Sequence, residues 1–386
     1  MDEREIQKIL LEILAAAVNG TDRDSASASA SKITSDDLAA VYRLAKQHDL
    51  APLVSGFFYR NRITEGGEDL RRKLRQDELM SVYRHEQMRY AFEEICGIFD
   101  EANIPYIPLK GSVIRPYYPE ESMRTSCDID ILIHEEDLER AISCLENRGY
   151  RRGNRHFHDV SLFAPNKVHL ELHFNIQENE KFLDVVLKDA WKYARLTKNS
   201  RYDFTKEFFV FHMYAHMAYH FLSGGCGIRS LLDIWIMEHK MDAHYSCARE
   251  LLKRAGIYSF AEEMSRVANL CFTEKKQDSF SELVLQYIFS GGVFGTQENQ
   301  IAVKKTKSNA LGYALKRVFL PYRYMVVAYP ILKKVPVLLP VCWILRWGKA
   351  IFNGKSGQFA AEVSCASNVP EEKLAQIKEI RSRLKL

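Results

Sequence analysis

The sequence predicts an α+β fold in which a small mixed β-sheet is flanked by helical regions at both ends of the chain. Three observations support this class. Apolar residues recur at helical spacing in the first hundred residues, as in Ile6, Ile9, Leu10, Ile13 and Leu14. Short runs rich in β-branched residues replace this spacing between about 101 and 200. Helical spacing then returns from Thr205 to about Ser290.

These changes of pattern divide the 386 residues into three regions. The first is an N-terminal helical region, 1–100. The second is the core, 101–200, and the third is a C-terminal helical region, 201–386, which contains a basic, apolar segment at 301–361. A chain of this length usually forms two or three domains.

Four segments of the core are expected to be strands. They are Ile104–Leu109, a run with Ile129, Ile131 and Ile133, then His158–Phe163 and Val168–Phe174. A helix from Glu135 to Asn147, ending at Gly149, separates the second strand from the third. The first segment contains two prolines, which predicts a strand that is buried or at an edge.

The charge is unevenly distributed. The net charge is +4, yet 301–361 holds eleven Lys or Arg and no Asp or Glu. Such a segment suggests an anionic partner. The N-terminus, Met1 to Glu5, is charged and lacks the apolar stretch of a signal peptide. The eight cysteines are scattered without a C-x-x-C pair, so we expect a reduced, cytoplasmic protein.

The residues that suggest chemistry are two aspartates on the second strand. Asp128 and Asp130 are two apart, so both side chains project from one face while Ile129 packs on the other. Two carboxylates so close repel each other unless a cation lies between them. Mg²⁺ prefers such oxygen ligands, and Glu171 on a later strand would supply a third carboxylate. We therefore predict two Mg²⁺ ions, with Mn²⁺ as an alternative.

A phosphate site is predicted beside them. Gly111 and Ser112 follow the first strand and would present backbone N–H groups and a hydroxyl to a phosphate. Lys110 and Arg124 would neutralise a triphosphate. A lone D-x-D pair is often a solvated strand edge, and a lone Gly-Ser is commoner still. The order and spacing of the three features favour the catalytic interpretation.

These residues resemble the uncharacterised bacterial nucleotidyltransferase family, within the superfamily of DNA polymerase β and kanamycin nucleotidyltransferase. The motifs are Lys110-Gly111-Ser112, Arg124, Asp128 to Ile133, Gly149-Tyr150 and Glu171-Leu172-His173. The resemblance implies a triphosphate-binding turn at Gly111 and Ser112. It also implies three metal ligands: Asp128, Asp130 and Glu171. The chain departs from the superfamily in Val113-Ile114-Arg115 after Gly-Ser, and in carrying Glu rather than Asp at 171.

The resemblance further implies the reaction: a nucleoside monophosphate moves from a nucleoside triphosphate, such as ATP, to an acceptor, and pyrophosphate leaves. The acceptor would be a small molecule, a glycan or a protein. Asp159 is a distant candidate for the general base. Two alternatives remain open. One is a catalytically idle module that binds or regulates, and the other is a modifier of the antibiotic-resistance or toxin-neutralising type.

Histidines offer further candidates. His169, Glu171 and His173 share one face of a strand, which would also suit zinc or iron. We favour Glu171 as a magnesium ligand, with His173 beside it or in contact with substrate. His212, His216 and His220 form a stripe on a predicted helix, either as packed imidazoles or with His216 and His220 over the cleft.

Two charged residues follow that stripe. Arg229 and Asp233 are four apart on the next predicted helix, which is most simply an ion pair within that helix. Arg229 is also a candidate substrate contact. Gly224, Gly225 and Gly227 link the two helices as a turn or a hinge.

The basic segment 301–361 mixes aromatic and aliphatic residues with Lys and Arg. Lys333, Lys334 and four prolines interrupt its apolar run, so we do not expect a transmembrane helix. An anionic membrane surface is one candidate partner, which would make the protein peripheral at a membrane. A buried hairpin with a basic outer face is another. A nucleic-acid groove ranks lower because no nucleic-acid motif accompanies the segment.

Overall fold

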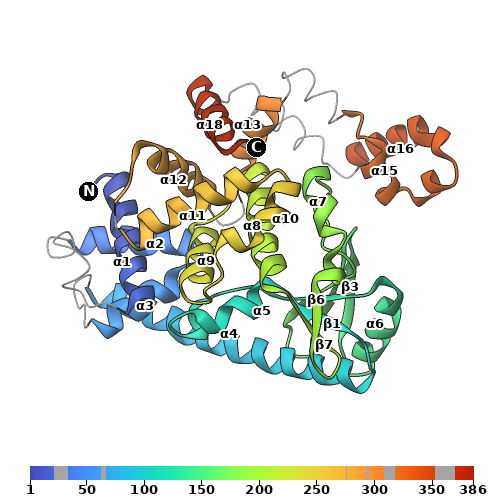
Figure 1. Cartoon of the computed structure of the whole chain (residues 1–386), viewed down its shortest axis with the longest axis horizontal. Coiled ribbons are helices and arrows are strands. Elements are labelled where there is room, and N and C mark those ends of the chain that lie inside the picture. Colours follow the sequence, from blue (N-terminus) through green and yellow to red (C-terminus); the bar gives the residue numbers. More distant parts are fainter. Residues whose placement is uncertain (21–33, 62–66, 275, 293–294, 308–317, 353–369) are drawn as a thin grey trace.

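The computed structural model describes residues 1–20, 34–61, 67–274, 276–292, 295–307, 318–352 and 370–386. These residues form a mostly helical α+β molecule with a seven-stranded mixed sheet in the middle and helices on both sides (Figure 1). The predicted fold class is therefore confirmed.

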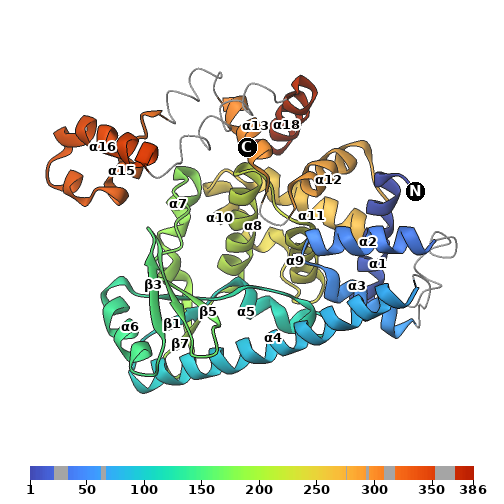
Figure 2. The same cartoon turned by 180° about the vertical axis from the view of Figure 1, so that it is seen from behind.

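The N-terminal helices are α1 (Glu3–Asn19), α2 (Ser35–Gln47), α3 (Ala51–Arg60) and α4 (Gly67–Glu101). Asp2 caps α1 and Thr34 caps α2, each in a reciprocal capping box. Helix α4 is the longest and runs along the base of the molecule (Figures 1 and 2). Its first turns bury Leu70 and Leu74 among the N-terminal helices, and its last turns bury Ile95 and Phe99 under the sheet. Helix α4 therefore joins the helical body to the sheet.

The strands of the sheet lie in the order β3-β4-β5-β2-β1-β7-β6. Their bounds are β1 (Tyr106–Pro108), β2 (Asp128–Ile133), β3 (Arg151–Arg155), β4 (Asp159–Phe163), β5 (His169–His173), β6 (Ala194–Lys198) and β7 (Arg201–Phe204). Strands β2 and β5 are parallel neighbours, although β5 follows β2 by more than thirty residues. The β1–β7 pair is also parallel, and the other pairs are antiparallel.

All four predicted strands are confirmed as β1, β2, β4 and β5, and three further strands were not predicted. Strand β3 is exposed along its whole length, and β6 is exposed after its first residue. Both lie at the edges of the sheet, where no apolar alternation is needed. Strand β7, paired with β6 across a turn at Asn199, is half-buried throughout and also lacks an alternating pattern.

The two faces of the sheet have opposite characters. Ile129, Ile131 and Ile133 point toward α4 and α6 (Leu138–Glu146), where they join a core with Leu170 and Leu172. The residues between them, Asp128 and Asp130, point to the other face because side chains alternate along a strand. In β2, the isoleucines therefore pack in the core, and the aspartates lie half-buried on the polar face of the sheet.

Helices α8 (Lys206–Leu222) and α9 (Ile228–His239) face the polar side of the sheet across a cavity. The helices around them are α7 (Lys181–Leu187), α10 (Arg249–Arg254), α11 (Tyr258–Phe272) and α12 (Ser279–Gly291). Their apolar residues share one core with α1, α2 and α3, so both ends of the chain build the helical body. The Gly224–Gly227 link packs tightly, with the Gly225 Cα so close to Gly291 that an added Cβ would lie 3.3 Å from its Cα. This close approach, together with a φ of +131° at Gly225, accounts for the glycine there.

The remaining helices are α13 (Gln297–Lys307), α15 (Tyr322–Ala328), α16 (Leu339–Phe352) and α18 (Glu371–Leu384). Helices α13 and α18 pack on each other beside α12, and α15 and α16 extend away from the body (Figure 1). Parts of the predicted basic segment, 308–317 and 353–361, lie outside the described residues. Within the described residues, no helix has the length and apolar character needed to cross a bilayer.

Candidate active site

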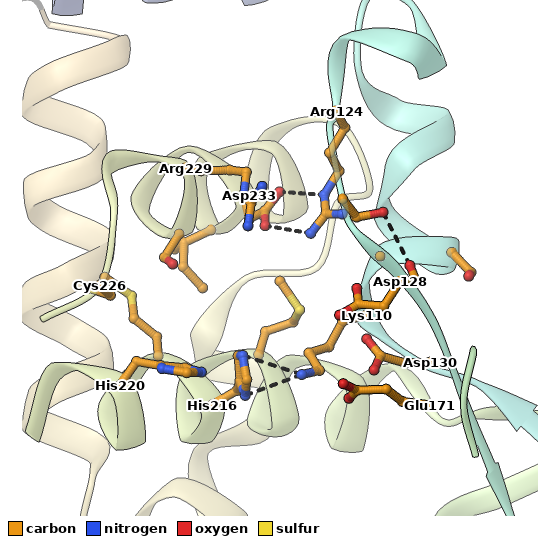
Figure 3. A pocket seen from close by; sticks show the side chains of 17 residues that line it. Lys110, Arg124, Asp128, Asp130, Glu171, His216, His220, Cys226, Arg229 and Asp233 are labelled. Atoms are coloured by element: carbon orange, nitrogen blue, oxygen red, sulfur yellow. Dashed lines mark hydrogen bonds and ion pairs between the residues drawn. The ribbon is translucent and has the colours of Figure 1, made fainter. Parts of the chain in front are cut away.

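Two parallel strands bring the three predicted carboxylates together. The register of β2 and β5 sets Asp128 opposite His169 and Asp130 opposite Glu171. Because paired residues point to the same face, Asp128, Asp130 and Glu171 all project from the polar face of the sheet. Figure 3 shows the three side chains grouped at one side of a cavity.

The charges of these carboxylates oppose one another. Burial raises the pKa of Glu171, and the negative charges of Asp130 and Asp128 raise it further, to about 7. Burial and Asp130 also raise the pKa of Asp128. Burial alone would raise the pKa of Asp130, but Lys110 and a hydrogen bond from His173 outweigh it and hold that pKa below its ordinary value. The cluster therefore carries more negative charge than its surroundings balance, which favours a bound cation.

His173 lies next to the carboxylates at the end of β5. Its Nε2 is 3.1 Å from Oδ1 of Asp130, and because a carboxylate accepts, Nε2 is the protonated nitrogen. The side chain is 9% exposed and does not line the cavity. Its position suits it to orient Asp130.

The donor atoms of this region gather in three overlapping groups, with ligand atoms within 4.8 Å of one another in each. Asp130, Glu171 and His173 form the first, Asp128, His169 and Glu171 the second, and His158, Asp159 and His173 the third. The trio His169, Glu171 and His173 does not form one group among the described residues. Glu171 is shared by the first two groups, which matches a carboxylate placed between two cations.

The predicted Gly-Ser turn begins a short helix. Lys110, Gly111 and Ser112 are the first three residues of α5 (Lys110–Ile114), directly after β1, and the Ser112 N–H bonds to the Leu109 carbonyl at 3.1 Å. A Cβ at Gly111 would lie 3.0 Å from Nη1 of Arg124. Glycine therefore allows the Arg124 guanidinium to approach the backbone of this turn.

Arg124 is buried in an ion pair that connects the sheet region to α9. Its Nε and Nη2 bond to the two carboxylate oxygens of Asp233 at 3.0 and 2.9 Å, and Tyr118 donates to the same carboxylate at 2.7 Å. Burial alone would lower the pKa of Arg124, but Asp233 outweighs this and raises it. Much of the positive charge of Arg124 is therefore balanced within the protein.

The predicted ion pair between Arg229 and Asp233 is wrong. Both lie on α9, but Asp233 binds Arg124, and Nη1 of Arg229 binds the carboxylate of Asp49 at 2.5 Å and the Thr125 carbonyl at 3.0 Å. The spacing of four residues suggested a local pair, whereas tertiary partners with better geometry hold both side chains. Arg229 still lines the cavity.

Lys110 points at the histidines of α8. Its Nζ is 3.2 Å from both ring nitrogens of His216, and Nδ1 of His216 is 3.3 Å from Glu178. Burial, together with Lys110, lowers the pKa of His216, and the same two causes lower that of His220 to about 4. His216 and His220 therefore line the cavity as neutral rings, while His212 is buried beneath it.

The cavity has a volume of about 290 Å³ and lies between the polar face of the sheet and helices α8 and α9 (Figure 3). All but one of the predicted site residues line it, the exception being His173; the lining includes Lys110, Gly111, Ser112, Arg124, Asp128, Asp130, Glu171, His216 and Arg229. Asp159 is also outside the lining and is 3% exposed. His158 lies 3.0 Å from Asp159 and lowers its pKa against the effect of burial, which makes Asp159 a weaker base.

Sequence reasoning missed three residues that shape this site. Arg115 follows the Gly-Ser turn, and its buried guanidinium donates to the Arg124 carbonyl and to the Ser126 hydroxyl, each at 2.7 Å. It thereby anchors the segment that leads into Asp128. Ser126 itself lines the cavity, and Glu178 contacts His216. Ser126 lies two residues before Asp128 and outside β2, so no strand pattern pointed to it.

Comparisons with known proteins identify the family. Residues 34–273, more than half of the chain, match the profile of a family described as "Uncharacterised nucleotidyltransferase". Searches of curated proteins and of solved structures gave no match. The matched range contains the whole sheet and every residue that lines the cavity. The chain therefore belongs to this family of uncharacterised nucleotidyltransferases.

Proposed function

We propose that the protein transfers a nucleoside monophosphate from a nucleoside triphosphate to an acceptor, with Asp128, Asp130 and Glu171 holding two magnesium ions. The observation that carries the proposal is the convergence of these carboxylates, from two strands in register, on a cavity that also contains Lys110, Gly111 and Ser112. Family membership implies a nucleoside triphosphate as the substrate. The residues also match the pattern of the superfamily of DNA polymerase β and kanamycin nucleotidyltransferase.

The donor set fits magnesium. Three carboxylates offer hard oxygen ligands, and the pKa of Glu171 is raised first by burial and then by the negative charges of Asp130 and Asp128. Such ions, when bound, neutralise phosphate charge and lower the energy of the charged transition state. Mn²⁺ would suit the same ligands. His173 would keep Asp130 oriented through its hydrogen bond.

The other residues would hold the substrate. Lys110 lies close enough to Asp130 to lower its pKa, so its ammonium would meet a phosphate bound beside the carboxylates. The Gly111 backbone would approach that phosphate without a side chain in the way. Arg124 lies close to Gly111 and is hydrogen-bonded to Asp233. It would therefore stabilise the conformation of the turn more than it would neutralise the charge of the triphosphate. The neutral rings of His216 and His220 would line the opposite wall.

In the reaction, an acceptor oxygen forms a bond to the α-phosphorus and its proton passes to solvent. The bond from the α-phosphorus to the bridging oxygen breaks, and pyrophosphate leaves. The residues named above supply positioning and charge balance, which are the main contributions of protein groups to phosphoryl and nucleotidyl transfer. The acceptor would be a small molecule, a glycan or a protein.

Binding can be tested without knowing the acceptor. Calorimetry with a non-hydrolysable triphosphate should show binding that requires Mg²⁺, and paramagnetic titration with Mn²⁺ should count two ions per chain. The matched variants are Asp128→Asn with Asp130→Asn, and a control of two exposed carboxylates outside the cavity, Asp242→Asn with Glu250→Gln.

The first pair of substitutions should abolish metal-dependent binding, and the control should keep it. Binding of triphosphate that is independent of metal in the native protein would contradict the proposal and support the idle module. If binding is confirmed, labelled triphosphate offered to candidate acceptors distinguishes a modifier of small molecules from a modifier of glycans or proteins.

A further inference from the structure

Residues 318–352 form a small unit with its own core. The unit consists of α15, two 3₁₀ turns (Pro330–Lys333 and Pro336–Leu338) and α16, which pack mainly on one another. Met325, Leu332 and Cys342 are buried at its centre. The indole nitrogens of Trp343 and Trp347 donate to the carbonyls of Leu320 and Val318, at 2.9 and 3.0 Å. We name these residues the α15–α16 unit.

Part of the outer surface of this unit is aliphatic. Val337 lies on the second 3₁₀ turn, and Val341, Ile344 and Leu345 share one side of α16; their exposed fractions are 80, 50, 62 and 52%. We name these four residues the apolar strip. Ile331 and Val335, also exposed, lie before the strip in the sequence. A soluble helix normally buries such a face, so the strip indicates a surface that meets another apolar phase.

Cations precede and follow the strip in the sequence. Lys333, Lys334 and Lys349 are exposed, and the sequence from 318 to 352 contains no Asp or Glu. The unit extends from the body on the side of α7, away from α1–α3, as the two opposite views agree (Figures 1 and 2). Nothing in its own sequence neutralises these cations, so the charge is available to an anionic partner.

We propose that the α15–α16 unit docks on the surface of an anionic lipid bilayer. The apolar strip enters the boundary between headgroups and acyl chains, and the lysines contact lipid phosphates. This proposal is independent of the transfer chemistry at the cavity.

Two other partners fit the surface less well. A nucleic acid would stack its bases on exposed aromatic rings, and Phe319, Tyr322 and Tyr324 are 41, 40 and 42% exposed. The more exposed residues of the unit, however, are the Val, Ile and Leu of the strip, which have no ring face. A second copy of this chain would bring two sets of lysines together without any acidic partner from the same segment. A bilayer with anionic lipids offers an apolar phase that can bury the aliphatic strip and phosphates that can pair with the lysines.

The test uses full-length protein and floating vesicles. One set is phosphatidylcholine alone, and the other is phosphatidylcholine mixed with phosphatidylglycerol. The native protein should float with the mixed vesicles and far less with the neutral ones, and added salt should weaken binding. The variant Ile344→Asp with Leu345→Asp should bind the mixed vesicles at least about tenfold more weakly.

A matched control removes the same amount of exposed apolar surface elsewhere. Leu79 and Tyr83 are 61 and 56% exposed on α4, whose exposed surface carries charges of both signs. Leu79→Asp with Tyr83→Asp should leave vesicle binding unchanged. A second variant, Lys333→Gln with Lys334→Gln, should lower binding roughly tenfold or more without touching the strip. Circular dichroism checks that each variant is folded.

Three results would overturn the proposal. The native protein would fail to float with anionic vesicles, or the α16 variant would float as well as the native protein. The third result would come from sedimentation equilibrium. The native protein would be a dimer, the variant Ile344→Asp with Leu345→Asp would be a monomer, and both would bind vesicles equally well. That outcome assigns the strip to a second copy of the chain.

Discussion

The two faces of β2 show how one strand serves two purposes. Ile129, Ile131 and Ile133 are almost fully buried between α4 and α6, whereas Asp128 and Asp130 face the cavity and repel each other. The apolar face stabilises the fold, and the polar face holds carboxylates whose mutual repulsion Lys110 and His173 offset at Asp130. Neighbouring residues of β2 therefore differ in role. Substitutions on the polar face should lower activity with little change in stability, and substitutions on the apolar face should lower stability with little change in ligand binding.

The largest effect is expected on the polar face. Asp128→Asn with Asp130→Asn should lower nucleotidyl transfer by at least about a thousandfold, because both of the proposed metal ions would lose ligands. The free energy of unfolding of the metal-free protein should change by no more than about 1 kcal/mol, since charge repulsion is removed along with the hydrogen bond to His173. Steady-state rates and urea denaturation measure the two quantities. A large loss of stability would show that the aspartates also hold the fold together.

Substitutions in the buried pair of Arg124 and Asp233 show whether a charged pair on the polar side of the sheet contributes to stability. Asp233→Ala should destabilise the protein by about 3 to 5 kcal/mol, because it leaves the guanidinium buried without a partner. Replacing both residues, Arg124→Met with Asp233→Leu, should restore most of that stability. Chemical denaturation of the two variants makes the comparison. If the two variants lost the same amount of unfolding free energy, the native pair would contribute through its packing and not through its charges.

A substitution on the apolar face should lower the free energy of unfolding and leave ligand binding intact. Ile131 is 0% exposed, and Ile131→Ala should cost about 3 kcal/mol in unfolding free energy. Metal-dependent triphosphate binding should persist at temperatures where the variant remains folded, because the strand pairing stays intact. Denaturation and calorimetry on the same preparation check both points. Loss of binding in the folded variant would show that the two faces are coupled.

The smallest expected effect is a dependence of stability on pH. The pKa of Glu171 is about 7 in the folded protein and near its ordinary value when unfolded, so the folded state holds more protons between those values. Stability of the metal-free protein should therefore fall as pH rises through this window. Magnesium requires the deprotonated carboxylate, so its stabilising effect should be greater near pH 8 than near pH 6, by about 1 kcal/mol. Thermal melts with and without magnesium measure this, and Glu171→Gln should remove the difference.

The sequence was informative where structure depends on local alternation. Asp128, Ile129 and Asp130 predicted both the strand and the side to which each residue points. Strands β3, β6 and β7 were not predicted because they lack a buried apolar face on alternate residues.

The sequence was least informative about long-range pairs. Arg124 and Asp233 are separated by 109 residues, and their bond depends on how α9 packs against the segment before β2. The spacing of Arg229 and Asp233 favoured a local pair, but the tertiary partners prevailed. Glu178 belongs to no motif, and only the folded chain brings it to His216. The residues of β2 and β5 that line the cavity could thus be predicted, and the partners that support them could not.

The pairing of α13 with α18 has a consequence for how the chain is assembled. Lys373, near the start of α18, binds Glu298, near the start of α13, at 2.8 Å, and the two helices pack on each other. The chain therefore leaves from the far end of α13 and re-enters the body beside the beginning of that helix. Replacing residues 308–369 with a linker of roughly eight residues should leave a folded body, because eight extended residues reach roughly 26 Å and α13 is roughly 16 Å long.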